Sequence, residues 1–330
     1  MADIFITRKT FDDVLERLDQ EGLSYEANQD DTPYSPEELA QAIRACGAPA
    51  LMCLLTDTVD AALMDAAPQL KVIANVAVGY NNVDVDAATE RGILVTNTPD
   101  VLTETTADLA FALLLAAARR LSEADPYTRA GKYEGWELFQ PHLGLDVHGK
   151  TLGIVGMGRI GEATAHRGAL GFGMRVLYHG GSPEPEVIEE LGAQEASLET
   201  LLQDSDFVSL HVPLTGETRH MIARRELEMM KPSAILVNTA RGPVVNEADL
   251  VAALKEGLIA GAGLDVFEEE PALHSELPAL QRHVVLAPHI GSATTETRLR
   301  MSLMAAENAI AVLKGQRPPN TVNTVVYDTQ

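Results

Sequence analysis

The feature that most constrains the fold is a glycine-rich segment, Gly156-Met157-Gly158-Arg159-Ile160-Gly161, which follows the apolar run KTLGIVG. GxGxxG spacing between a strand and a helix is typical of the first turn of a dinucleotide-binding sheet. The first glycine permits a tight turn, the second lets backbone approach a pyrophosphate, and the third lets the helix pack on the strand. The helix N-terminus adds amide donors. The segment therefore predicts a dinucleotide site at Gly156, Gly158, Arg159, Ile160 and Gly161.

Short apolar runs alternate with helical stretches along the whole chain, as in α/β folds with parallel sheets. The runs cover residues 3–8, 50–56, 70–79 and 92–97, and then 150–156, 174–180, 206–213, 234–240, 261–267 and 284–290. The second series is self-contained, which predicts a six-stranded doubly wound domain inserted into a first one. We expect two Rossmann-like domains: a flavodoxin-like substrate domain over 1–103 and 292–330, and a dinucleotide-binding domain over 104–291.

Two segments beside the inserted domain have distinctive compositions. Residues 104–120, ETTADLAFALLLAAARR, read as a helix that ends in two arginines. This helix is too apolar to have one exposed face, so we expect it to be buried between the domains. Residues 127–149 are rich in aromatic, proline and glycine residues, which predicts a loop or linker.

The charge and cysteine content exclude several classes of protein. The chain carries 48 acidic and 25 basic residues, a net charge of −23, which should repel nucleic acids and anionic membranes. It has no apolar run of about 18 residues that could span a bilayer and no secretory signal pattern at its start. Cys46 and Cys53 form neither a disulfide framework nor a metal-ligand set. We expect a cytoplasmic protein with no metal, nucleic-acid or membrane partner.

The end of the second strand of the inserted domain bears on the choice of cofactor. In NAD-binding sheets an acid at this place holds the ribose 2′-hydroxyl, but here the sequence reads Tyr178-His179-Gly180-Gly181-Ser182. The missing acid admits the 2′-phosphate of NADP(H), although no arginine is present to bind it. We therefore expect His179, Gly180, Gly181 and Ser182 to contact the adenosine end, with NADP(H) favoured and NAD(H) left open.

Polar residues at the ends of the later strands indicate the chemistry, because ligands of open α/β sheets bind beyond the carboxyl ends of strands. Arg241 and Glu270 follow two of these runs, and His289 lies at the end of a third. An arginine fork binds a carboxylate, a histidine can donate a proton to a carbonyl oxygen, and a glutamate can orient the imidazole and favour its protonated form. This set suits reduction of a carbonyl beside a carboxylate; a structural ion pair is the alternative.

Three separated segments resemble the D-isomer-specific 2-hydroxyacid dehydrogenase family: GIVGMGRIG, then LVNTARGPVVNEADLVAALKEGLIAGAGLDVFEEEP, then VVLAPHIGSAT. The resemblance covers nearly the whole chain, and the segment ANVAVGYNNVDVDAATERGILVTNTPDVLTETTADLAFALLL is most similar to glyoxylate and hydroxypyruvate reductases. It implies NAD(P)H-dependent reduction of small 2-oxo acids, glyoxylate to glycolate or hydroxypyruvate to D-glycerate. A D-lactate enzyme, a short-form D-3-phosphoglycerate dehydrogenase and a nucleotide-sensing corepressor with the same core are the alternatives.

The resemblance also implies roles for particular residues. Arg241 matches the arginine that binds the substrate carboxylate and keto oxygen, Glu270 matches the acid paired with the catalytic histidine, and His289 matches the proton donor, which also contacts the substrate. The backbone amides of Val78 and Gly79 match a loop that holds the substrate carboxylate.

Further cofactor contacts are expected where the strands of the inserted domain end. They are Val212, Pro213, Thr239, Ala240, Arg241, Asp265, His289 and Gly291, with Thr106 on the long helix. Among them, Asp265 matches the residue that commonly receives the nicotinamide amide. A buried helix threonine is the alternative reading of Thr106.

The resemblance implies a homodimer formed around the helix at 104–120. Trp136 lies where relatives pass an aromatic loop towards the neighbouring subunit's active site, and simple surface packing is the alternative. We expect His166 and His211 to be structural. His142 and His148 have no metal-ligand partners near them in the sequence.

Overall fold

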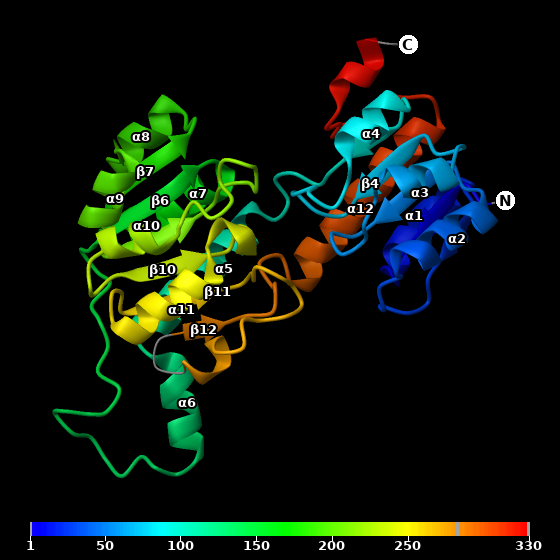
Figure 1. Cartoon of the computed structure of the whole chain (residues 1–330). Coiled ribbons are helices and arrows are strands. Elements are labelled where there is room, and N and C mark those ends of the chain that lie inside the picture. The colour runs from blue at the N-terminus through cyan, green and yellow to red at the C-terminus, as the bar shows by residue number, and fades with distance from the viewer. Residues whose placement is uncertain (1, 281–283, 329–330) are drawn as a thin grey trace. The chain divides into compact units, whose positions relative to one another are not determined.

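The computed structural model describes residues 2–280 and 284–328 and divides into two compact units (Figure 1). The first unit is Met1–Leu102 with Ala293–Gln330, and the second, Thr103–Ser292, is inserted between these two segments. Residues 1, 281–283 and 329–330, which fall within the expected domains, lie outside the described residues. The expected α/β class with two parallel sheets is confirmed.

The first unit contains a five-stranded parallel sheet in the order β2-β1-β3-β4-β5, the flavodoxin-like order. Its strands are β1 Ile4–Ile6, β2 Tyr25–Ala27, β3 Ala50–Cys53, β4 Val72–Asn75 and β5 Leu94–Thr96. Four of them lie in the predicted runs, whereas β2 was not predicted. It is a three-residue edge strand with partly exposed side chains, so it lacks the apolar run that marks a buried strand.

Helices cover both faces of this sheet. They are α1 Asp12–Gln20, α2 Pro36–Cys46, α3 Ala61–Ala66, α4 Val85–Glu90 and α12 Thr295–Leu313, with a 3₁₀ turn at Thr324–Asp328. Leu39 and Ile43 of α2 and Leu63 of α3 pack with Leu51 and Ile73 of the sheet in one buried cluster. Helix α12 instead packs with α1 and contacts β3 and β4. The last segment of the chain thereby completes the first unit.

The second unit contains a seven-stranded parallel sheet in the order β12-β11-β10-β9-β6-β7-β8. Its strands are β6 Thr151–Met157, β7 Arg175–Gly181, β8 Gln194–Glu195, β9 Phe207–Leu210, β10 Ile235–Asn238, β11 Gly261–Leu264 and β12 Val284–Leu286. The order reverses between β6 and β9, as in doubly wound sheets. Six strands match the predicted runs; β8 is an extra edge strand of two exposed residues, too short to give a pattern.

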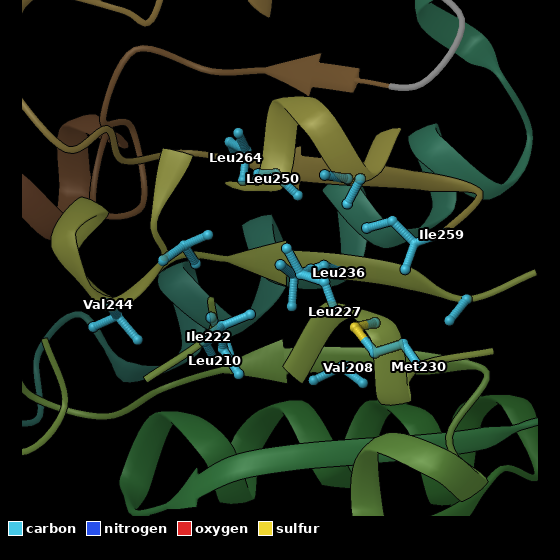
Figure 2. Close-up of a cluster of buried hydrophobic side chains, with 14 of the residues drawn as sticks. Val208, Leu210, Ile222, Leu227, Met230, Leu236, Val244, Leu250, Ile259 and Leu264 are labelled. Atoms are coloured by element: carbon cyan, nitrogen blue, oxygen red, sulfur yellow. The ribbon is translucent and has the colours of Figure 1, made fainter. Parts of the chain in front are cut away.

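Alternate side chains of these strands belong to two hydrophobic cores, one on each face of the seven-stranded sheet, as the two-residue period of a strand requires. The helices are α5 Thr103–Ala118, α6 Leu121–Arg129, α7 Arg159–His166, α8 Pro185–Leu191, α9 Leu198–Asp204, α10 Arg224–Met229 and α11 Glu247–Glu256. Ile154 packs with residues of α5 and α7, whereas Val155 packs with those of α9, α10 and α11. Figure 2 shows part of the second core, including Leu236 and Leu250.

The region after α5 differs in part from the prediction. The helix ends at Ala118, before the two arginines, and Arg120 adopts a left-handed φ of 54°. A second helix, α6, follows at once and includes the first three residues of the predicted loop; no regular helix or strand is assigned from 130 to 149. Helix α5 packs on β10, β11 and β12 of its own unit. No helix in the described ranges has both the length and the apolarity to cross a membrane.

Candidate active site

The glycine-rich turn joins β6 to α7. Gly156 has a φ of 95°, and a Cβ there would lie 2.9 Å from the His211 carbonyl; a Cβ on Gly161 would lie 2.2 Å from Gly156 O. Gly158 is the N-cap of α7 and has no atom within 4 Å of its Cβ position. Gly156 and Gly161 therefore permit close packing, and Gly158 leaves the N-terminal amides of α7 accessible. This cradle fits a pyrophosphate.

The end of β7 holds the residues expected at the adenosine end of a cofactor. His179 Nδ1 lies 3.0 Å from Ala196 O, so its other nitrogen, Nε2, is the one left for a ligand. Gly181 pairs with Met157 of the glycine-rich turn, and a Cβ on Gly181 would lie 2.6 Å from Met157 backbone atoms. Gly180 and Ser182 are exposed. A side chain at position 181 would therefore push the strand away from the turn.

The ends of β9 and β10 carry the next predicted contacts. Val212 and Pro213 follow β9, and Val212 Cγ1 would lie 2.9 Å from a Cβ on Gly156. Thr239 follows β10, and its buried Oγ1 has no hydrogen-bond partner among the residues that the structure describes. A buried hydroxyl without a partner is costly, so Thr239 fits a position where a bound ligand completes the hydrogen bond.

Arg241 is placed by a short turn that Asn238 shapes. Asn238 Oδ1 accepts from the Ala240 N–H at 3.0 Å, and Asn238 Nδ2 donates to Arg241 O at 3.0 Å. Arg241 Nη1 donates to Ala240 O at 2.6 Å. Burial lowers the pKa of Arg241, and the charge of Glu270 opposes this shift. Within the described part of the chain the guanidinium forms no ion pair, so most of its donors are available to a ligand.

Glu270 and His289 form the pair that the sequence predicted. Glu270 Oε2 lies 2.8 Å from His289 Nδ1, and Glu270 Oε1 accepts from the Phe267 N–H at 3.0 Å. Burial would raise the pKa of Glu270, but His289, Phe267 and Arg241 together lower it. Since Glu270 holds Nδ1, the other ring nitrogen, Nε2, is left to meet a substrate.

The turn that carries His289 is fixed by two residues predicted as cofactor contacts. Asp265 accepts from Ile290 N–H at 2.7 Å and from Gly291 N–H at 2.8 Å, and His289 N–H donates to Asp265 O at 2.9 Å. Thr106 Oγ1 donates to Gly291 O at 3.3 Å. Burial raises the pKa of Asp265, although the two amide bonds oppose it. The left-handed φ of 53° at His289 is thus held from several sides.

Gly242 is a residue that the sequence analysis missed. A Cβ at this position would lie 1.7 Å from Phe267 O and 2.5 Å from Glu268 N. The segment after Arg241 therefore packs directly on the peptide that leads to Glu270, and only glycine permits this approach. The Arg-Gly pair directly after a buried strand was the available signal.

Further residues singled out in the sequence include two in the first unit and two histidines in the second. Val78 and Gly79 form a half-buried turn after β4 in the first unit. His211 Nε2 lies 2.8 Å from Ser209 Oγ, and burial lowers the pKa of His211 to about 3. His166 ends α7. The described residues contain no group of three or more histidine, cysteine, aspartate or glutamate side chains that could hold a metal.

The 121–143 region exposes large apolar side chains. Trp136 is 75% exposed. The others with a similar exposure are Leu121, Tyr133, Leu138, Phe139 and Leu143. The ring of His142 lies 4.9 Å from that of Tyr127. Exposed large apolar side chains gathered in one segment are typical of interaction surfaces.

Comparison with known proteins extends these observations. Residues 111–291 match the family model "D-isomer specific 2-hydroxyacid dehydrogenase, NAD binding domain". The chain is 53% identical over 324 residues to a glyoxylate reductase of Thermococcus litoralis, covering 97% of this chain and 96% of that one. It is also 53% identical to a glyoxylate reductase of Korarchaeum cryptofilum, covering 98% and 96% of the two chains.

Solved structures also match this chain over nearly its whole length. A protein from Thermus thermophilus superposes with a TM-score of 0.88 at 48% identity, covering 97% of this chain and 99% of that one. An NADPH-dependent glyoxylate/hydroxypyruvate reductase from Sinorhizobium meliloti, solved with NADP and malonate, superposes with a TM-score of 0.84 at 36% identity, covering 97% and 96%. With these matches along nearly its whole length, the chain belongs to the D-isomer specific 2-hydroxyacid dehydrogenase family.

Proposed function

We propose that the protein is a cytoplasmic glyoxylate reductase that also accepts hydroxypyruvate and uses NADP(H) in preference to NAD(H). The observation that carries this proposal is the Glu270–His289 pair at 2.8 Å, in the same unit as an Arg241 guanidinium that has no ion-pair partner among the described residues. The relatives named glyoxylate reductase support the choice of substrate. The buried, unpaired Cys46 and Cys53 fit a reducing compartment.

The residues of the second unit fit a nicotinamide dinucleotide. The amides of the glycine-rich turn and the N-terminus of α7 would hold the pyrophosphate, and Thr239 and Asp265 would lie along the nicotinamide half. When bound, this cofactor supplies the hydride that reduces the carbonyl carbon.

The chain's own groups do the remaining work. Arg241 binds the substrate carboxylate through charge-assisted hydrogen bonds and polarises the keto oxygen. His289 donates a proton from Nε2 to that oxygen, which becomes the hydroxyl of a D-2-hydroxy acid. Glu270 keeps the ring oriented through Nδ1 and balances its positive charge. His289 then takes up a proton from water before the next turnover.

NADP(H) is favoured because no acid stands at the end of β7. His179 occupies that position, and the exposed Gly180 and Gly181 have no side chain that would cover the backbone there. A His179→Asp variant should lower the ratio of kcat/KM for NADPH to that for NADH by about tenfold or more, since a carboxylate repels a 2′-phosphate. An unchanged ratio would contradict the preference.

The exposed apolar side chains around Trp136 support a homodimer formed through the second unit, with α5 and the 121–143 region at the interface. In that dimer Trp136 would reach towards the active site of the neighbouring subunit. Light scattering should give a mass of about twice 35.5 kDa for the wild type, and replacing Trp136 and Phe139 by serine should lower it. A wild-type monomer would overturn the dimer.

The decisive test of the function is a matrix of initial rates. It sets glyoxylate, hydroxypyruvate, pyruvate and oxaloacetate against NADPH and NADH. We expect the highest kcat/KM for glyoxylate with NADPH. A preference for pyruvate would favour a D-lactate enzyme, and tight cofactor binding without turnover on any oxo acid would favour a nucleotide sensor.

A further inference from the structure

The turn after β4 has its carbonyl side bound within the first unit. Three successive carbonyl groups each accept a hydrogen bond, two from residues that follow β5 and one from the last residue of β4. The pairs are Thr98 N to Ala77 O at 2.9 Å, Asn97 Nδ2 to Val78 O at 2.9 Å, and Asn75 Nδ2 to Gly79 O at 3.0 Å. Two of the three donors are neutral side-chain amides.

The amide side of the same turn is open. Because a trans peptide is planar, its N–H points opposite to its C=O, so fixing these three carbonyls fixes the N–H groups of Val78, Gly79 and Tyr80. Among the described residues, none of these three N–H groups has an acceptor. Successive amides that face one way form a concave site for an anion. Val78 and Gly79 are half-buried, where an N–H group without a partner is costly.

The two asparagines are themselves held in place. Asn75 is the last residue of β4 and is fully buried. The backbone of Asn97 is tied to the C-terminal segment, since its N–H donates to Asn320 O at 3.3 Å and its carbonyl accepts from Asn308 Nδ2 at 3.3 Å. An aspartate could not donate to the turn, and a lysine or arginine would compete for the anion.

We propose that Asn97 and Asn75 are positioning residues for substrate binding: they lock the peptide planes of the turn so that its amides face the substrate carboxylate. This inference rests on the proposed function. Asn97 fixes the N–H of Gly79, and Asn75 fixes the N–H of Tyr80. Neither side chain takes part in the chemical step.

The test measures KM separately from kcat for Asn97→Ala and Asn75→Ala. Without the asparagine, the N–H of Gly79 or Tyr80 is no longer aligned with the substrate carboxylate. Loss of that hydrogen bond to a charged group should raise KM for glyoxylate about tenfold. The inhibition constant of oxamate, an unreactive analogue, should rise equally. The KM for NADPH should not change, and kcat should stay within a few-fold of wild type, because the proton donor is untouched.

Asn323→Ala is the matched control. Asn323 is also buried, and its Nδ2 donates to Ile93 O at 2.9 Å, before the start of β5 and so at the opposite end of the same sheet. Asn323→Ala should lower stability without raising KM.

Equal KM changes in Asn97→Ala and Asn323→Ala would overturn the inference while leaving the proposed function intact. A wild type inactive on every oxo acid would overturn both. If Asn75→Ala does not fold, Asn97→Ala decides alone.

Discussion

The two sheets end in different kinds of chemistry. At the carboxyl ends of the second unit's strands lie charged side chains: Arg241 follows a turn that Asn238 shapes, and Glu270 pairs with His289, whose turn Asp265 holds. At the same ends in the first unit lie backbone amides, oriented by the neutral side chains of Asn75 and Asn97. One α/β architecture thus serves both as a frame for reactive groups and as a frame for oriented peptides.

The largest effect should come from the proton donor. His289→Gln keeps a polar side chain beside Glu270 but cannot donate a labile proton, so kcat should fall by about 10²–10⁴-fold. NADPH binding, measured by fluorescence titration, should stay within twofold. Turnover close to wild type would show that His289 is not the proton donor, and the second unit would then no longer differ from the first by supplying the reactive group.

The arginine fork should come next. Arg241→Lys keeps the charge but loses the paired donors, so kcat/KM for glyoxylate should fall about 10–100-fold. Arg224→Lys, in an exposed cluster with Glu228 and Glu256, is the control and should be nearly silent. If both variants behave alike, the fork is not used for binding.

Gly242 tests the packing that joins two parts of the charged site. Gly242→Ala places a Cβ on the Phe267 carbonyl, so the free energy of unfolding should fall by about 1–3 kcal/mol and kcat should drop with it. Gly216→Ala, which has open space at its Cβ, serves as the matched control. Unchanged stability and kcat in Gly242→Ala would show that the two segments need not be in contact.

The smallest effect concerns His211, which directly follows β9 and is not one of the charged residues of the site. Its pKa of about 3 in the folded state lies below the unfolded value of 6.5, so the unfolded state alone gains a proton as the pH falls below 6.5. By pH 5 this costs about 2 kcal/mol of stability relative to pH 7.5.

Urea unfolding at both pH values should therefore show a smaller loss for His211→Asn than for wild type. His166→Gln, at the end of α7, is the control. A pH-independent difference between His211→Asn and wild type would show that the His211 ring binds protons equally in the folded and unfolded states, which would contradict the lowered pKa.

The contrast between the units also explains what the sequence could predict. Ten apolar runs marked ten strands, whereas β2 and β8 are short and partly exposed and so left no pattern. The charged residues stood at strand ends, where chemistry is expected. Asn97, Asn75 and Gly242 act through neutral hydrogen bonds or a missing side chain, and their partners are fixed only by the three-dimensional fold.

The most direct test of this division of labour compares His289→Gln and Asn97→Ala in one assay of glyoxylate reduction and one titration with oxamate. We predict that His289→Gln loses at least about 100-fold in kcat yet binds oxamate within a few-fold of wild type. Asn97→Ala should keep most of kcat and bind oxamate about tenfold more weakly. The opposite pattern, with kcat lost in Asn97→Ala and oxamate binding lost in His289→Gln, would contradict it.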